Sequence, residues 1–402
     1  MVYGNVSRFQ VIGRVLRRNL FEASGFIMES GSKLLDYGVS TFNPKRLLGP
    51  TADMIAKDVD LSGKNCLITG GSNGIGLEIT KCMSDRNCEM LLACRNPYAT
   101  MQVAKKFLKD NDQLKLFEVN LASLASVKKC ADDILEKIEK LDIVILNAGV
   151  FGGPWMLTED GLETTFQVNY LSHYYLLSKI EKLLAPNARV IVVASESHKY
   201  VNWDLTSALM PSEENLSLPP NEYTTIRSYN VSKLCSLLMC QYLKYQWLNT
   251  DKSIFAIHPG SFVKTNLCQN WWVYEALYTM MKPFSKTVQQ AASTAMFVAT
   301  NPDITNLAAV YYKDCAPSAE SALAADRHLA FRISELTADM LRARVDDFTP
   351  LAQQSTVVDE YDRLQFDDLL SNPSLPLHTV VAAAPTAHKH TDQKDVNDFI
   401  VN

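Results

Sequence analysis

The 402-residue sequence lacks the features that mark several classes of protein. Its nine cysteines form no Cys-x-x-Cys pair, so there is no zinc-type spacing, and reduced core thiols in an intracellular protein are favoured. The formal net charge of -5 provides no basic surface for nucleic acid. No uninterrupted apolar stretch reaches the ~18 residues that a membrane-spanning helix needs. We therefore expect no resident metal, no nucleic-acid partner and no transmembrane span.

What is present indicates a globular protein with a large core, because 47% of the residues are hydrophobic and 21% are charged. Three regions are predicted: an N-terminal arm at 1–60, an α/β body at 61–345 and a C-terminal tail at 346–402. From about residue 371 the tail has few large apolar side chains. Such a segment cannot bury enough surface to offset the entropy of ordering, so we expect it to be largely disordered.

The start of the arm has a distinct pattern of its own. Residues 1–21 contain four arginines and no acid, with apolar side chains at helical spacing. A basic amphipathic helix of this kind is typical of a mitochondrial transit peptide or of a segment that lies on a membrane surface. It also suits a helix that docks on the body. We expect a cytoplasmic protein, with mitochondrial or peripheral membrane association through residues 1–21 as the alternative.

The body alternates strand-like and helix-like runs. Helix-like segments separate the strands, as at Ser123–Lys140, Gly161–Leu184 and Tyr229–Trp247. Strands joined in this way pair in parallel through right-handed crossovers, with helices on both faces of the sheet. The predicted fold is α/β, a doubly wound Rossmann-type parallel sheet of about seven strands. The strand candidates are Asn65–Thr69, Glu89–Cys94, Lys115–Asn120, Ile143–Asn147, Arg189–Ala194, Ser253–His258 and Ala309–Lys313.

A glycine-rich segment follows the first predicted strand and leads into a helix-like run. Its sequence over 70–76, here called the glycine loop, is Gly-Gly-Ser-Asn-Gly-Ile-Gly. Glycine permits a tight turn and a close approach of backbone to phosphate, while a helix N-terminus supplies free N–H groups and partial positive charge. The loop therefore predicts a dinucleotide site. The expected contacts are Gly70, Ser72, Asn73, Gly74, Ile75 and Gly76.

Arg95 indicates which dinucleotide binds. It follows the second predicted strand, where a site selective for NAD usually carries an acidic residue. A guanidinium there favours the 2′-phosphate of NADP by its charge and its forked donors. The alternative is an arginine that merely points to solvent after a strand. We expect NADP(H) to be favoured over NAD(H).

Tyr229 and Lys233 are the strongest candidates for chemistry. At a spacing of four residues they share one helix face. A phenol with a pKa of about 10 is a poor acid or base at neutral pH, but a nearby ammonium favours the phenolate. Tyr-x-x-x-Lys alone is a weak motif, because an exposed helix produces it by chance. The motif indicates function only because it occurs together with the other motifs in the chain.

Taken together, these motifs resemble those of the short-chain dehydrogenases/reductases. The glycine loop, Asn147-Ala148-Gly149, Ser195 and Tyr229-x-x-x-Lys233 occur in the order and rough spacing of that family. The segments 157–169 and 189–198 look most like the retinol-dehydrogenase-like members and the members that carry WW modules. One departure is clear: none of the five tryptophans lies in the arm, so WW modules and their partners are not carried over.

The resemblance implies a role for each of four residues. Tyr229 would be the general acid in reduction and the base in oxidation, and Lys233 would hold the nicotinamide ribose and depress the tyrosine pKa. Ser195, preferred to Ser197 because it aligns with the second serine of the family's pair, would hydrogen-bond the substrate oxygen. Asn169 would keep a proton-relay water near the lysine, or else make only a core hydrogen bond.

The resemblance also implies further cofactor contacts and two departures from the family pattern. Asn120 stands where an aspartate usually ends the third strand, and Leu146 replaces the first asparagine of Asn-Asn-Ala-Gly. His258 beside the Pro-Gly turn is expected to be structural. The further contacts implied are Asn120, Leu121, Asn147, Ala148, Gly149, Pro259, Gly260 and, at the nicotinamide carboxamide, Thr265.

The predicted substrate is a small hydrophobic alcohol or carbonyl, such as a retinoid, a steroid or another lipid. The segments expected to wall its pocket, 151–155, 200–226 and 262–284, are rich in aromatic and aliphatic residues. Those side chains would otherwise pack the domain or a dimer surface. The resemblance implies a homodimer through the helices near 171–184 and 234–242, unless the arm and tail cover them. A cofactor-binding scaffold with little turnover is the alternative function.

Overall fold

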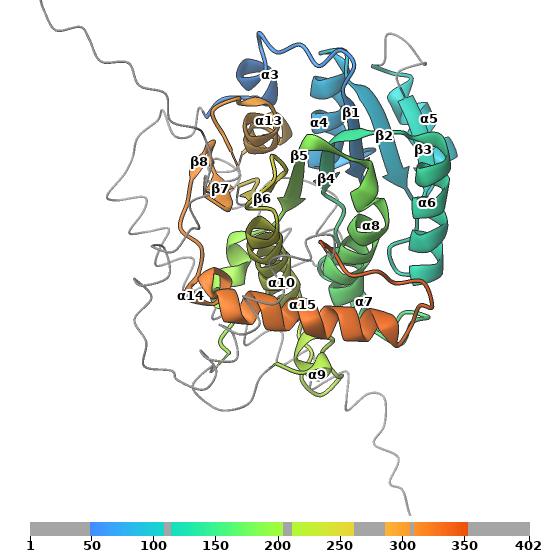
Figure 1. The fold of residues 1–402 in the computed structure, drawn as a ribbon, viewed down its shortest axis with the longest axis vertical. Coiled ribbons are helices and arrows are strands. Elements are labelled where there is room, and N and C mark those ends of the chain that lie inside the picture. Colours follow the sequence, from blue (N-terminus) through green and yellow to red (C-terminus); the bar gives the residue numbers. More distant parts are fainter. Residues whose placement is uncertain (1–48, 108–113, 204–210, 261–285, 306–308, 353–402) are drawn as a thin grey trace, which may run out of the picture. The chain divides into compact units, whose positions relative to one another are not determined.

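The computed structural model describes residues 49–107, 114–203, 211–260, 286–305 and 309–352. These residues form one eight-stranded sheet with helices on both faces (Figure 1). The strand order is β3-β2-β1-β4-β5-β6-β7-β8. The predictions for residues 1–21, for Thr265, for the pocket segment 262–284 and for the tail lie outside the described residues.

The doubly wound sheet predicted from the sequence is confirmed. All neighbouring strands from β3 to β7 pair in parallel, and the two-residue β8 pairs antiparallel with β7. The order reverses between β1 and β4, which is where ligands bind on such sheets, beyond the carboxyl ends of the strands. The strands are β1 Asn65–Thr69, β2 Glu89–Cys94, β3 Leu114–Glu118, β4 Leu141–Leu146, β5 Leu184–Val193, β6 Ser253–His258, β7 Tyr311–Lys313 and β8 Ala316–Pro317.

Alternate residues of the buried strands pack into two separate cores. In β1, Leu67 belongs to one core, whereas Cys66 and Ile68 belong to the other. The first core lies under α6 (Leu124–Lys137), α8 (Ser172–Ile180) and α10 (Thr225–Gln246). The second lies under α3 (Ala52–Ile55), α4 (Gly74–Ser84), α5 (Pro97–Ala104), α12 (Val288–Ala291) and α13 (Ser293–Thr300). Strands buried on both faces explain the continuous apolar runs in the sequence.

Two elements differ from the predicted boundaries. The predicted helix 161–184 is divided into α7 (Thr164–Phe166), a π-helical turn η2 (Gln167–Leu171), α8 and a short 3-10 helix η3 (Glu181–Leu183). Strand β5 starts at Leu184, five residues before the expected Arg189, with a register shift against β4 between Leu141 and Ile143. The domain boundaries stay a prediction, although Ala52 already belongs to the second core.

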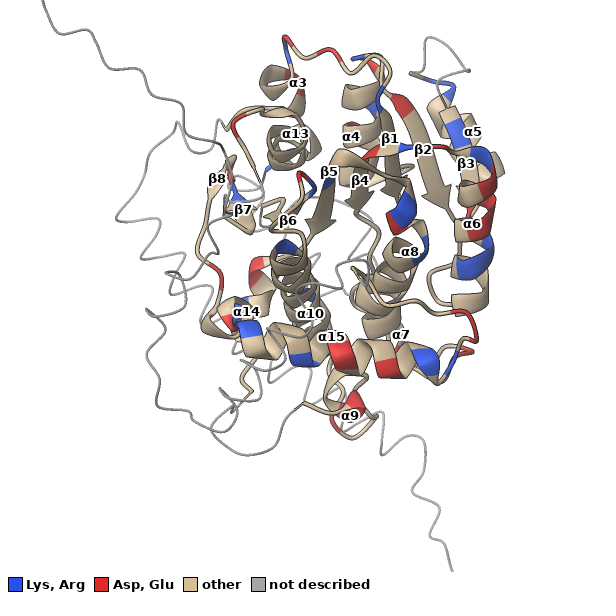
Figure 2. Ribbon diagram, in the orientation of Figure 1, with Lys and Arg blue, Asp and Glu red and all other residues tan. Residues whose placement is uncertain are grey.

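Helix α15 (Arg327–Arg342) crosses α10 on the outer side of the first core (Figure 1). The Tyr170 hydroxyl lies 2.8 Å from Thr337 Oγ1, and the Tyr174 hydroxyl lies 2.8 Å from Ser334 Oγ. The Phe331 ring packs edge-on against Tyr242 of α10, with ring centroids 5.1 Å apart. These contacts make α15 an integral part of the fold. The rest of its surface carries charges of both signs (Figure 2). The remaining short helices are α9 (Glu213–Leu216) and α14 (Ala322–Ala325).

Two searches within the described residues give negative results. None of their helices is both long enough and apolar enough to cross a membrane. In the same part of the chain, no three or more His, Cys, Asp or Glu side chains are grouped so that they could hold a metal ion.

Candidate active site

The glycine loop joins the carboxyl end of β1 to the N-terminus of α4. Gly70 and Gly74 have φ values of +68° and +53°, a region that favours glycine. The Gly70 N–H donates to the Ala93 carbonyl of β2 at 3.1 Å, which fixes the start of the loop. Asn73 is the N-cap of α4 but makes no side-chain capping bond. The first-turn N–H groups of α4 are therefore available to an anion.

Gly76, the last residue of the glycine loop, lies close to Asn147, which directly follows β4. A Cβ atom on Gly76 would lie 2.5 Å from Asn147 Nδ2 and still closer to the Gly70 carbonyl oxygen. The Asn147 amide donates to the carbonyls of Thr69 at 2.9 Å and Gly70 at 3.3 Å. Backbone thus approaches backbone without an intervening side chain. This geometry fits a group that must contact the loop main chain, as a pyrophosphate does.

Thr69, the last residue of β1, connects the carboxyl ends of β1 and β4 through its side chain. Its hydroxyl oxygen accepts hydrogen bonds from the N–H groups of Asn147 and Ala148, both at 3.0 Å. The residue is fully buried. The turn 147–149 after β4 is therefore held in register with the start of the glycine loop.

Two of the predicted cofactor contacts, Arg95 and Asn120, follow β2, which pairs with β1, and β3, the strand beyond β2. Arg95 directly follows β2 and is exposed. Asn120 is also exposed, and its side chain accepts from the Ala122 N–H at 3.1 Å. Leu121 is buried, and its carbonyl accepts from the Ser172 hydroxyl. Both polar side chains are thus exposed beyond the carboxyl ends of their strands, whereas Leu121 is part of the first core.

Helix α10 places Tyr229 and Lys233 near the carboxyl end of β5. Lys233 is only 4% exposed, and its Nζ donates to the Val193 carbonyl at the end of β5 at 2.7 Å. Burial lowers the pKa of Lys233 to about 8, so most of the ammonium is charged at neutral pH. Its Nζ lies 5.5 Å from the centroid of the Tyr229 ring. The two side chains therefore share one face, as the spacing predicts.

Asn169 lies in the π-helical turn η2 and is buried. Its Oδ1 accepts from the Val150 N–H at 2.7 Å, and its Nδ2 donates to the Val150 carbonyl at 3.0 Å and to Ser232 Oγ at 3.1 Å. A Cβ on Gly149 would lie 3.2 Å from Asn169 Oδ1 and 3.9 Å from Lys233 Nζ. Gly149 therefore lies close to both Asn169 and Lys233, and a side chain at this position would contact both.

Ser195 follows β5 and begins a short 3-10 helix, η4 (Glu196–Tyr200), that packs against α10. Its Oγ accepts from the Ser197 N–H at 3.2 Å. The turn is held by His198, whose Nδ1 contacts the Ser195 carbonyl at 2.6 Å and whose Nε2 accepts from the Ser321 N–H at 3.1 Å. Nδ1 therefore carries the proton, and η4 is tied to the segment that leads into α14.

Two supporting residues carry no role in the sequence prediction. His198 is one of them. Glu163 is the other: fully buried, it caps α7 by accepting from the N–H groups of Thr165 at 2.7 Å and Phe166 at 2.9 Å. It also accepts from the hydroxyl of Ser228, the residue before Tyr229. Only its place in the segment 157–169 hinted at a function.

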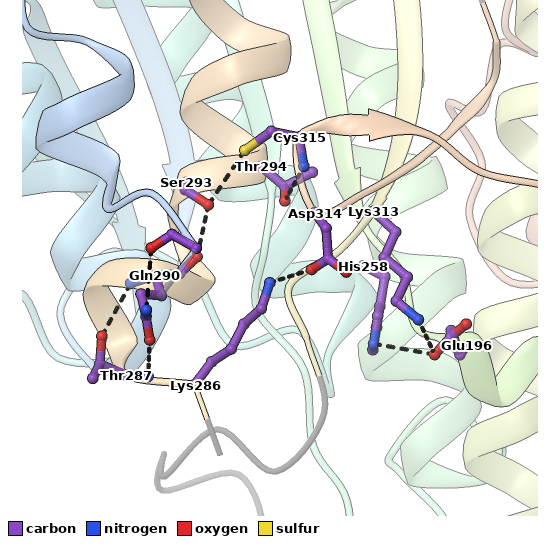
Figure 3. Close-up of polar contacts among 11 residues, drawn as sticks. Glu196, His258, Lys286, Thr287, Gln290, Ser293, Thr294, Lys313, Asp314 and Cys315 are labelled. Atoms are coloured by element: carbon purple, nitrogen blue, oxygen red, sulfur yellow. Dashed lines mark hydrogen bonds and ion pairs between the residues drawn. The ribbon is translucent and has the colours of Figure 1, made fainter. Parts of the chain in front are cut away.

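A group of charged residues lies beyond the ends of β5, β6 and β7 (Figure 3). Glu196 accepts from Lys313 Nζ at 2.9 Å and lies 3.7 Å from His258 Nε2, while Lys286 pairs with Asp314. Burial lowers the pKa of His258 to about 4, so the imidazole is neutral near pH 7. These pairs connect the turn at Ser195 with the Pro259-Gly260 turn, where the chain leaves β6.

Two of the three predicted pocket segments come together beside Tyr229. The ring of Phe151 packs edge-on against the Tyr229 ring, with centroids 4.9 Å apart. The Trp155 indole donates to the Leu218 carbonyl at 3.0 Å, and the Tyr223 hydroxyl donates to the Gly153 carbonyl at 2.7 Å. The segment 151–155 is thereby fixed to the insertion 200–226.

Comparison with known proteins agrees with this geometry. Residues 64–206 match the model of the short chain dehydrogenase family. The chain is 37% identical over 292 residues to the WW domain-containing oxidoreductase of Drosophila melanogaster, which covers 71% of each chain. It is 27% identical over 321 residues to retinol dehydrogenase 14 of Homo sapiens, covering 74% of this chain and 93% of that one.

A solved structure shows the same fold. An uncharacterized protein from Mycobacterium paratuberculosis superposes with a TM-score of 0.58 and 22% identity, over 73% of this chain and 98% of its own. The predicted resemblance to members with WW modules and to retinol-dehydrogenase-like members is confirmed. The chain belongs to the short-chain dehydrogenase/reductase family of nicotinamide-dependent oxidoreductases.

Proposed function

We propose that this protein transfers a hydride between NADP(H) and a hydrophobic alcohol/carbonyl pair. The observation that carries the proposal is the placement of Lys233 and Asn169 close to Gly149, with Tyr229 on the same face of α10 as Lys233. The glycine loop lies at the carboxyl end of β1, and Lys233 contacts Val193 at the carboxyl end of β5. One edge of the sheet would therefore hold both a site for a pyrophosphate and a half-buried acid–base group, Tyr229, beside the buried Lys233.

The main chain of the glycine loop and the first turn of α4 would hold the pyrophosphate. Asn147, Ala148 and Gly149 would line the floor beside it, and Pro259 and Gly260 would lie near the nicotinamide. When bound, the cofactor supplies or accepts the hydride. The Arg95 guanidinium is exposed beside the adenosine side, where its forked donors suit the 2′-phosphate of NADP.

Tyr229 would move the proton. In reduction its hydroxyl protonates the carbonyl oxygen, while the Ser195 hydroxyl donates a second hydrogen bond to that oxygen. The Lys233 ammonium stabilises the phenolate that remains. General acid catalysis contributes about 10²–10⁴-fold, and a positioned donor to the developing oxyanion about 10²–10³-fold.

Asn169 would hold the relay water through its main chain. Both protons of its side-chain amide are donated, to Val150 and Ser232, and Oδ1 already accepts from Val150. The Asn169 carbonyl, which lies 3.2 Å from His173 Nδ1, has a second lone pair that can accept from a water. Such a water would return the proton to Tyr229 by way of Lys233.

The proposed substrate is a retinoid, a steroid or another lipid-like alcohol or ketone. Phe151 lies against the Tyr229 ring, and the segment that contains it is held to Leu218 by the Trp155 indole. The name of retinol dehydrogenase 14 among the relatives supports the same class. An apolar wall selects by shape and excludes water from the reacting oxygen.

We further propose that α15 prevents a homodimer through α8 and α10. The family surface implied by the sequence is occupied in this chain by the contacts of Tyr170, Tyr174 and Tyr242 with α15. A second copy would have to displace that helix from the first core. The chain would therefore be monomeric, or would assemble through another face.

The experiment that tests the function is a titration of the purified protein with NADPH, followed by turnover assays with a panel of retinoid and steroid carbonyls. We expect NADPH binding and turnover that requires Tyr229. Absence of NADPH binding would refute the proposal. Cofactor binding without turnover of any panel member would favour the scaffold function.

A further inference from the structure

We propose that His173 is a positioning residue that couples the glycine loop to Asn169. Its ring lies between the two halves of the site, with Nε2 3.0 Å from Thr69 Oγ1 and Nδ1 3.2 Å from the Asn169 carbonyl oxygen. The inference rests on the proposed function, because it assigns separate effects on cofactor binding and on turnover to the two ring nitrogens.

The direction of each hydrogen bond follows from the number of available protons. Thr69 Oγ1 accepts the N–H groups of Asn147 and Ala148, which uses both of its lone pairs. Its single proton is therefore donated to the remaining partner, His173 Nε2. Nε2 is thus an acceptor, and the neutral ring carries its proton on Nδ1, which donates to the Asn169 carbonyl.

The environment keeps His173 in this neutral form. The side chain is 1% exposed, and Thr69 is fully buried. Burial and, to a smaller extent, the positive charge of Lys233 lower the pKa of His173 to about 4. A second ring proton would leave the Thr69 hydroxyl proton without its acceptor, so the arrangement is defined only for the neutral ring.

At the Asn169 end, His173 fixes a carbonyl rather than a side chain. The two residues are four apart, and the histidine ring reaches back over the π-helical turn that contains Asn169. The asparagine side chain is held by its hydrogen bonds to Val150 and Ser232, and we assign the relay water to the main-chain carbonyl. The Nδ1 proton occupies one of its lone pairs and directs the other.

At the Thr69 end, His173 fixes a hydroxyl. With Nε2 as acceptor, the hydroxyl proton points away from Asn147 and Ala148, and both lone pairs remain directed to their N–H groups. Loss of the acceptor leaves a buried hydroxyl proton without a partner, which is unfavourable. The hydroxyl would then rotate to recover a partner and release the floor of the cofactor site.

Two substitutions separate these effects. In His173→Gln the terminal amide lies near the position of Nε2, so an acceptor for Thr69 is kept and the donor to Asn169 is lost. In His173→Asn the shorter amide lies near Nδ1, so the donor is kept and the acceptor is lost. His328→Gln, at an exposed histidine of α15, is the matched control.

The measurements are the NADPH dissociation constant by fluorescence titration, kcat at saturating NADPH, and the melting temperature. We expect His173→Gln to lower kcat about tenfold with the NADPH affinity within about twofold of wild type. His173→Asn is expected to weaken NADPH binding about tenfold with a smaller effect on kcat. His328→Gln should change neither.

Thr69 provides a second route that leaves the histidine intact. Thr69→Val removes the hydroxyl with little change of shape and should weaken NADPH binding, whereas Thr69→Ser keeps the hydroxyl and should restore it. Equal loss of affinity and kcat in both His173 variants, or a lower melting temperature alone, would overturn the inference. Failure of the wild-type protein to bind NADPH would instead refute the proposed function.

Discussion

Substitution of Gly76 by alanine tests whether the glycine loop is built for a cofactor. The new Cβ would lie 2.5 Å from Asn147 Nδ2 and closer still to the Gly70 carbonyl oxygen, whereas real Cβ contacts below 3.0 Å are essentially never observed. The loop must therefore shift by at least about half an ångström, and the Asn147 amide must leave the carbonyls of Thr69 and Gly70. Overpacking of this kind costs about 1–3 kcal/mol.

If this free energy of overpacking destabilises only the loop conformation that binds NADPH, the NADPH dissociation constant rises about five- to 150-fold. Fluorescence titration with NADPH measures it, and far-ultraviolet circular dichroism checks that the sheet is retained. Gly153→Ala is the control for cofactor affinity, because its Cβ would meet nothing within 4 Å. Wild-type affinity in Gly76→Ala would refute this reasoning, since the loop would then tolerate a side chain at its closest approach.

Three further predictions follow from the described contacts. Arg95→Ala should reduce the preference for NADPH over NADH, measured as the ratio of the two dissociation constants, and an unchanged ratio would mean that Arg95 does not contact the 2′-phosphate. Burial lowers the pKa of His173 and of His258 from 6.5 to about 4, so the unfolded chain binds more protons than the folded chain between pH 4 and 6.5. The free energy of unfolding should therefore fall between pH 7 and pH 5 by about 2 kcal/mol per histidine, and equal urea midpoints at the two pH values would contradict this. Light scattering after gel filtration should give the mass of a monomer or of a dimer that leaves α15 in place, and a cross-link between α10 helices of two copies would contradict the proposed role of α15.

Much of the sheet could be predicted because its strands are buried apolar runs with clear ends. The bounds of β1, β2 and β6 agree with the sequence prediction. The start of β5 was missed because Pro186 and Asn187 are poor strand residues, and the pairing with β4 is irregular there. The antiparallel β8 has only two residues, too short for a pattern.

The helix 161–184 was predicted as continuous because its apolar residues keep helical spacing throughout. The π-helical turn at Asn169 depends on contacts with Val150 and Ser232, which are distant in sequence. The glycine loop and the Tyr229–Lys233 pair were predicted from local spacing. The role of His173 was not predicted, because the sequence alone indicates only a core histidine on an apolar helix. Its partner Thr69 is 104 residues away in the sequence, and only the fold brings the two together.

The central claim, that Tyr229 transfers the proton at a bound NADP(H), is tested most directly by Tyr229→Phe in the full chain. The account predicts an NADPH dissociation constant within about threefold of wild type and a loss of kcat of about 10²–10⁴-fold. Tyr98→Phe, at a tyrosine that is 77% exposed, should keep wild-type turnover. Turnover by Tyr229→Phe at the wild-type rate would contradict the account.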